Sequence, residues 1–156
     1  MEFKDFFEDE ACYQAYIIRL EKKIRSFSNS FMSNSKWKKL FVAICQNQDL
    51  IKQCEIYNFF EPCVNELVFR NIQSNLGQYI QQEYISNQIT TAEYPTFYRE
   101  IQYLEFLKSW NGNQIGKFVE PIKQTQDIEQ IRTYLSRFGE FRFEQTDNFL
   151  RILGYS

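Results

Sequence analysis

Hydrophobic side chains recur every three or four positions in three stretches of this chain, which is the spacing of an amphipathic helix. The first stretch covers residues 8–27, where charged residues separate two neighbouring apolar rows. A Ser- and Asn-rich linker at 26–35 should end this helix, because short hydroxyl and amide side chains compete for its backbone hydrogen bonds. The two rows are Ala11, Ala15 and Ile18, and Ile17, Leu20 and Ile24.

The second and third helices combine an apolar stripe with recognisable signals at their ends. Asn34 or Ser35 is the predicted cap of the second helix, which should end near Gln48. Thr125 is the predicted cap of the third, and Gly139 stands where a left-handed residue commonly ends a helix. The stripes are Trp37, Leu40, Phe41 and Ile44 in the second helix, and Ile128, Ile131, Leu135 and Phe138 in the third.

Between these two helices, β-branched and aromatic residues cluster in short runs, which favours strands at 50–60, 67–72, 79–85 and 96–110. Within 98–107 the apolar phase shifts between Tyr103 and Leu104. We therefore expect either a bulge or a strand covered on both faces, as in the middle of a sheet. Asn111-Gly112 is a hairpin signal, so the chain should turn there and return through 114–119, as far as Pro121.

The tail, residues 141–153, alternates apolar and polar residues on both sides of Asp147-Asn148. A two-residue turn there would set Glu144 opposite Arg151 and Phe143 opposite Ile152. The element order predicts one α+β domain over 1–156, with its main body at 36–155. In this fold an antiparallel sheet carries helices mainly on one face, and the C-terminal helix is followed by a β-hairpin.

The composition argues against catalysis. The chain has 16 Phe, 10 Tyr and 2 Trp but no His, the commonest general base and metal ligand. It contains no glycine-rich phosphate loop and only five glycines. The four cysteines are too widely spaced for a zinc motif and are predicted to be reduced, mostly buried thiols. They are Cys12, Cys45, Cys54 and Cys63. We expect no enzyme activity, no cofactor and no bound metal.

The net charge of −2 is unevenly distributed. Residues 19–39 carry seven bases and one acid, whereas residues 40–156 carry 14 acids and ten bases. A mildly acidic body favours basic partners over nucleic acid. The basic segment 19–39 could contact phosphates, although a solvated helix face explains it more simply. The acidic start and the lack of a long apolar run predict a cytoplasmic protein that makes no membrane contact.

One catalytic alternative stays open in the sequence. Glu100, Glu105 and Lys108 fall on one predicted strand and could contribute to a metal-dependent nuclease site. Glu100 and Glu105 are separated by an odd number of residues, so they project to opposite faces of a regular strand. Solvated sheet charges are the favoured interpretation.

Aromatic residues beside acidic ones mark the candidate binding surface. Such a surface suits protein recognition, although packing under a loop accounts for each residue equally well, and stacking on RNA is a third alternative. The candidate partner-binding residues are Glu83, Tyr84, Glu93, Tyr94, Tyr98, Glu100 and Trp110.

Four short segments together resemble an uncharacterised family of small bacterial α+β proteins and, more broadly, the immunity proteins of contact-dependent and other polymorphic toxin systems. They are Trp37-Lys-Lys-Leu-Phe41, the run from Tyr98 to Phe106, Leu135-x-x-x-Gly139-x-Phe141, and Leu150-Arg-Ile-Leu-Gly-Tyr155. The resemblance covers about residues 36–155. It implies a cytoplasmic antidote that binds one cognate toxin domain, often a nuclease, one to one and blocks its active site or substrate path. The alternative is a small regulatory or adaptor protein that contacts nucleic acid through 19–39.

Overall fold

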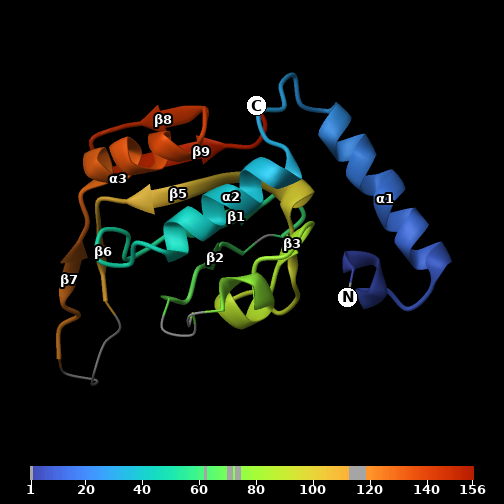
Figure 1. Ribbon diagram of the computed structural model, residues 1–156, viewed down its shortest axis with the longest axis horizontal. Coiled ribbons are helices and arrows are strands. Elements are labelled where there is room, and N and C mark those ends of the chain that lie inside the picture. The colour runs from blue at the N-terminus through green and yellow to red at the C-terminus, as the bar shows by residue number, and fades with distance from the viewer. Residues whose placement is uncertain (1, 62, 70–71, 73–74, 113–118) are drawn as a thin grey trace.

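The computed structural model describes residues 2–156 except 62, 70–71, 73–74 and 113–118 (Figure 1). The described helices are α1 (Glu10–Arg25), α2 (Asn34–Cys45) and α3 (Ile128–Leu135). The main sheet contains β1 (Glu55–Asn58), β2 (Asn65–Glu66), β5 (Ile101–Leu107), β8 (Phe143–Gln145) and β9 (Phe149–Leu153). Two small pairs are formed by β3 (Tyr84–Ile85) with β4 (Thr96–Phe97), and by β6 (Ser109–Asn111) with β7 (Lys123–Thr125).

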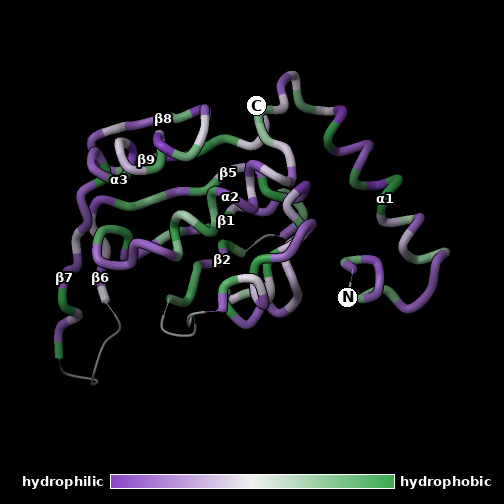
Figure 2. Tube along the Cα trace, viewed as in Figure 1, coloured by the Kyte–Doolittle hydropathy of each residue, from purple (hydrophilic) through white to green (hydrophobic). Residues whose placement is uncertain are grey.

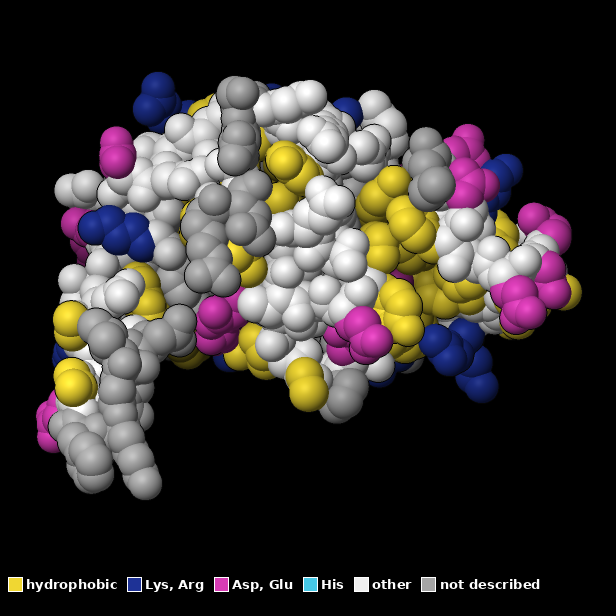
Figure 3. All heavy atoms as spheres, turned by 90° about the horizontal axis from the view of Figure 1, so that it is seen from below, with side chains coloured by type: hydrophobic (Ala, Val, Ile, Leu, Met, Phe, Trp, Pro, Cys, Tyr) yellow, Lys and Arg dark blue, Asp and Glu magenta, His cyan; other side chains and the backbone are white. Residues whose placement is uncertain are grey.

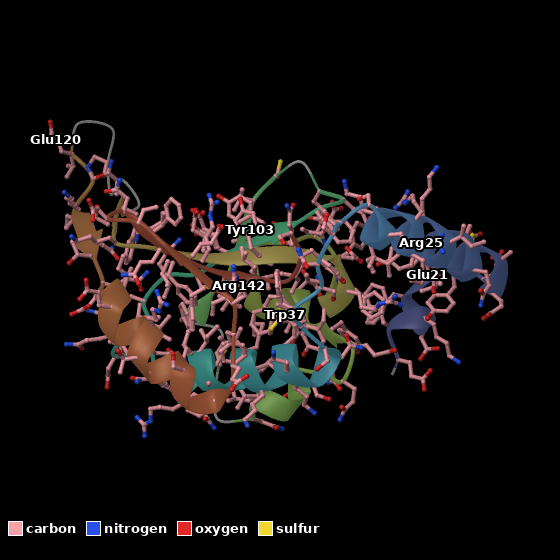
Figure 4. All side chains as sticks on the ribbon, turned by 90° about the horizontal axis from the view of Figure 1, so that it is seen from above. Glu21, Arg25, Trp37, Tyr103, Glu120 and Arg142 are labelled. Atoms are coloured by element: carbon pink, nitrogen blue, oxygen red, sulfur yellow. The ribbon has the colours of Figure 1, made fainter. Side chains whose placement is uncertain are left out.

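The five main strands form an antiparallel sheet in the order β2-β1-β5-β9-β8, with β5 in the centre. Helices α2 and α3 both lie on one face of this sheet (Figure 4). This architecture, with a C-terminal helix followed by a hairpin, confirms the predicted α+β class. Three neighbouring strands supply fully buried side chains to the helix-covered face, and the stripes of α2 and α3 cover them. The strand residues are Ile56, Leu104, Phe106, Leu150 and Ile152.

The C-terminal hairpin has the predicted register. Glu144 pairs with Arg151 and Phe143 with Ile152. The Thr146 amide donates to the Phe149 carbonyl over 3.0 Å, so Asp147 and Asn148 form the two-residue turn. The bulge expected from the phase shift is also present, because the register between β1 and β5 slips where Tyr57 faces Tyr103 and the next residue, Asn58, faces Ile101.

Most of the other predicted strands are shorter than the sequence indicated. Only 55–58 of the run 50–60 forms a strand, and 79–85 contributes β3 and a bridge between Ile80 and Ile85. The run 67–72, part of which lies outside the described residues, contributes a bridge from Leu67 to Thr90. The run 96–110 is divided among β4, a 3-10 turn at Tyr98–Glu100, β5 and β6. Between the short strands, turns and single backbone bonds take the place of a ladder, and side chains bind some of the amides, as Asn58 Oδ1 does for Phe60 at 2.8 Å.

The hairpin predicted at Asn111-Gly112 is also different. Asn111 pairs with Lys123, so the chain returns at β7 after a longer connection than two residues. The predicted return segment 114–119 lies almost wholly outside the described residues. The β6–β7 pair forms an arm at the end of the sheet opposite α1 (Figures 1 and 4).

The helix caps differ from the predicted ones by one or two residues. Ser33 caps α2, accepting from the Lys36 amide at 3.2 Å. Asp127 caps α3, because Thr125 is committed to β7. Gly139 has a positive φ of 157°, which L side chains rarely adopt, but its ψ of 175° differs from that of the predicted left-handed helical residue.

The N-terminal segment, comprising a 3-10 turn at Phe3–Phe6 and helix α1, packs beside the sheet as a second cluster. Hydrophilic and hydrophobic residues alternate along α1 (Figure 2). Of its two predicted rows, the one with Ile17 and Leu20 faces inward, whereas Ile18 is 67% exposed. The linker that follows is fixed to the C-terminus, where the amides of Ser28 and Asn29 donate to the Ser156 carbonyl.

Gly154 is required where the linker, α2 and β5 converge. A Cβ atom there would lie 2.5 Å from the Ile101 carbonyl oxygen and 3.0 Å from Trp37 Cζ2. We expect Gly154→Ala to lower the free energy of unfolding by about 1–3 kcal/mol, the usual cost of overpacking a tight site. Gly77→Ala is the control, because the nearest atom to its added Cβ is 3.8 Å away. Equal urea midpoints for the two variants would contradict this expectation.

Candidate protein-interaction face

The outer face of the sheet, the one turned away from α2 and α3, carries the candidate site. Tyr103 points to this side of β5, whereas Trp37 lies between the sheet and α2 (Figure 4). Strand pairing aligns four acids and one base in a single row across all five strands. In order, the row is Glu66, Glu55, Glu105, Arg151 and Glu144. In the described part of the chain, no helix covers this row (Figure 4).

Glu105 at the centre of the row is held by both neighbouring strands. The Arg151 Nε donates to Glu105 Oε1 over 2.7 Å. The Tyr57 hydroxyl lies 3.1 Å from Glu55 Oε2 and 3.2 Å from Glu105 Oε2. Burial raises the pKa of Glu55, opposed by the hydrogen bond from Tyr57 and reinforced by the charge of Glu105. The Arg151 Nη1 also lies 4.0 Å from Glu144 Oε1, and the row, with four carboxyl groups and one guanidinium, is acidic.

Aromatic rings lie beside the acidic row and fix its side chains. Tyr57 and Tyr103 stack with their centroids 4.2 Å apart and an interplanar angle of 22°. The Arg151 guanidinium carbon is 4.5 Å from the centroid of Tyr103 and 4.3 Å from that of Phe149. These side chains are half-buried and held by one another, so little conformational entropy would be lost when a partner covers them.

Three of the sequence-predicted contact residues are buried, so their predicted place on the surface is wrong. Tyr98 is fully buried, and its hydroxyl donates to the Gln81 carbonyl over 2.7 Å. Tyr84 is 7% exposed and packs in the N-terminal cluster. Glu100 is also 7% exposed and accepts hydrogen bonds from Tyr16 and Asn58, which join α1 and β1. The interleaved acids and aromatics at 83–100 are largely packing contacts.

The other four predicted residues lie on two separate parts of the molecule. Glu93 and Tyr94 are exposed in the connection between β3 and β4, with Glu83 half-exposed beside β3. Trp110 lies on the β6–β7 arm, opposite Gln124, and is half-exposed. These residues therefore do not form one contact surface with Trp110.

Glu100 and Glu105 do not share a site, which removes the geometric basis of the nuclease alternative. Glu100 lies in the 3-10 turn before β5, bound to Tyr16, whereas Glu105 is paired with Arg151. Both are buried, so the prediction of solvated charges is also wrong. In the part of the chain that the structure describes, no three Cys, Asp or Glu side chains are placed to hold a metal ion.

The cysteines are free, but only two of them are buried. Cys45 and Cys54 lie in the core, whereas Cys12 and Cys63 are exposed, which corrects the expectation that most would be buried. Burial raises the pKa of the Cys45 thiol to about 12, which keeps it protonated and unreactive at neutral pH.

Several bases of segment 19–39 are engaged within the protein. Lys36 Nζ donates to the carbonyls of Phe31 and Glu140 over 3.0 and 2.7 Å. The guanidinium carbon of Arg19 lies 4.6 Å from the Phe60 ring centroid, and Lys23 Nζ lies 5.4 Å from that of Phe27. Such contacts weaken the case for a free phosphate-binding surface.

The buried Glu100 carboxyl predicts a pH dependence of stability. Burial raises its pKa above 4.5, although the hydrogen bonds from Tyr16 and Asn58 oppose this increase. A carboxyl group whose pKa is higher in the folded chain than in the unfolded one binds its proton more tightly when folded. Its favourable contribution is therefore complete below about pH 4.5 and is lost as the pH rises through the folded-state pKa.

The variant Glu100→Gln has no titrating group at this position, so comparing it with the wild type isolates the contribution of Glu100 to the pH dependence of stability. The free energy of unfolding of the wild type, relative to that of Glu100→Gln, should fall as the pH rises from about 4 to 7. Denaturant titrations at each pH measure this difference. A difference that stays constant or grows with pH would contradict the assignment.

No protein-family model, curated protein or solved structure matches this chain. In the described ranges, no helix has the length and apolar character needed to cross a membrane.

Sequence reasoning considered Glu105 and Arg151 separately and missed the outer face that joins them with Glu55, Tyr57 and Tyr103. The available signal was the two-residue spacing of Tyr103 and Glu105 within one strand, which puts both on the same face. The pairing of β1 with β5 is what adds Tyr57 and Glu55.

Proposed function

We propose that this protein is an immunity protein that binds a cognate bacterial toxin domain and neutralises it by covering the active site or substrate path. The observation that carries the proposal is the outer face, where an acidic row runs beside two stacked tyrosines. The likeness of the segments in 36–155 to immunity proteins points in the same direction. The function needs no catalytic group in this chain.

The chemistry of the outer face favours a basic partner. Its carboxylates would attract a positively charged surface and accelerate encounter, since complementary charge acts mainly on the association rate. Tyrosine rings supply large contact areas with few rotatable bonds and are common hot spots at protein interfaces. A nuclease domain, whose substrate is polyanionic, presents the basic surface that this face would cover.

The proposal is tested with purified bacterial toxin domains, beginning with any that is encoded beside this gene. We expect a one-to-one complex, loss of the toxin's activity, and an association rate that falls as salt is added. A toxin that stays fully active in the presence of excess protein would contradict the proposal. Salt-dependent binding of RNA or DNA through Lys22, Lys23, Lys36 and Lys38 would replace it with the adaptor function.

A further inference from the structure

A separate cavity of about 200 Å³ lies where the N-terminal segment meets the rest of the chain. Hydrophobic side chains gather at this junction (Figure 3). The cavity is lined by rings and carboxylates, without a basic side chain. The lining residues are Phe3, Phe6, Phe7, Glu61, Tyr94, Pro95 and Glu100.

A second layer of rings holds the aromatic walls in place. Phe3 stacks on Phe97, with centroids 4.4 Å apart and an interplanar angle of 14°. Phe7 lies 4.9 Å from Tyr16, and Phe6 meets Tyr84 edge-on at 5.4 Å. The walls formed by Phe3, Phe6 and Phe7 are therefore held in place without a ligand.

Two of the lining rings are exposed although a packed core would bury them. Tyr94 is 68% exposed and Phe6 is 47% exposed. Both line a concave space, so a ligand that entered it would cover apolar surface that now faces water.

The charged groups of the lining favour a positively charged ligand. Glu100 contributes a buried carboxyl group, whose two oxygens are oriented by Tyr16 and Asn58. Glu61 contributes an exposed one, which accepts from the Asn65 Nδ2 over 2.7 Å. The nearby Arg19 guanidinium lies over the Phe60 ring and is not part of the lining.

We propose that this cavity binds a small organic cation, an alkylated ammonium group. Aromatic faces attract such cations through their ring quadrupoles, and methyl groups on the nitrogen bury apolar surface against the same rings. The exposed carboxylate of Glu61 supplies the main counter-charge, and Glu100, whose pKa is raised by burial, adds to it where it is ionised. A cavity of this volume accommodates a head group of that size but not an extended ligand. The inference is independent of the toxin-binding proposal, because it concerns the free protein.

The test compares choline with 3,3-dimethyl-1-butanol, its uncharged isostere, by ligand-observed NMR and calorimetry on the full chain. We expect choline to bind at least about tenfold more tightly, since shape and apolar area are matched and only the charge differs. Tyr94→Ala and Glu61→Gln should each weaken choline binding about threefold or more. Glu21→Gln, an exposed position on α1, is the charge-matched control and should leave it unchanged.

Equal binding of the two compounds, or no detectable choline binding up to about 10 mM, would overturn the proposal, because a built cation site should exceed that affinity. So would an affinity that is unchanged in both Tyr94→Ala and Glu61→Gln. Both altered side chains are exposed, so the variants should fold, and circular dichroism checks that they do.

Discussion

The double variant Tyr57→Ala, Tyr103→Ala is expected to bind the cognate toxin domain at least about 100-fold more weakly than the wild type, through faster dissociation. The two rings stack on each other at the centre of the outer face, where a partner would exclude water most completely. Removing both also takes away the Tyr103 ring beside the Arg151 guanidinium, which lies 4.5 Å from the Tyr103 centroid and stays paired with Glu105. Surface plasmon resonance separates the two rate constants.

Charge reversal at the two ends of the acidic row should change the association rate constant. Glu66 and Glu144 are exposed at the two ends of the row, so Glu66→Lys with Glu144→Lys should slow association and flatten its salt dependence. Glu21→Lys on α1 makes the same kind of charge change away from the sheet and serves as the control. If the tyrosine variant and the Glu66→Lys, Glu144→Lys variant both bind as the wild type does, the outer face is not the contact surface.

The second large effect concerns stability. Gln126 is 7% exposed, and its side chain joins the segment before β1 to the end of β5. Its Nε2 donates to the carbonyls of Gln53 and Leu107 over 3.0 and 2.8 Å, and its Oε1 accepts from the amides of Lys52 and Gln53. Its Nε2 also donates to Gln53 Oε1 over 3.2 Å, and Gln126→Ala removes all five bonds. We expect the free energy of unfolding to fall by about 3 kcal/mol or more, because each buried group left unpaired costs about 1–3 kcal/mol.

The chain supplies a matched control two positions away. Gln124 is exposed on β7, so Gln124→Ala should change the free energy of unfolding by less than about 0.5 kcal/mol. Urea denaturation of the two variants measures the contrast. Similar losses in both would show that the hydrogen bonds of Gln126 do not hold β5 to the segment before β1.

The sequence predicted correctly those elements that depend on residues close together in the chain. The stripes of the three helices and the turn at Asp147-Asn148 each lie within a few neighbouring residues, so period and turn chemistry were sufficient to find them. The register of the last hairpin, with Glu144 opposite Arg151, follows from that turn alone.

The features that the sequence did not predict depend on contacts between residues far apart in the chain. Glu100 is buried, and the hydroxyl that donates to its carboxyl group belongs to Tyr16, 84 positions away. Glu105 meets Tyr57 and Arg151 only after strands distant in sequence have paired, at separations of 48 and 46 positions. The burial of Gln126 and its hydrogen bonds could not be predicted from the sequence either, because a lone glutamine before a helix is typical of a solvated loop.

Oxidative footprinting of the toxin complex tests the outer face most directly. Hydroxyl radicals label exposed aromatic side chains, and mass spectrometry compares each residue in the free and bound protein. We expect Tyr57, Tyr103 and Phe149 to be protected on binding, while Tyr94 and Trp110 keep the labelling that they have in the free protein. Protection of Tyr94 or Trp110, with Tyr57 and Tyr103 unchanged, would contradict the assignment of the outer face as the toxin-binding surface.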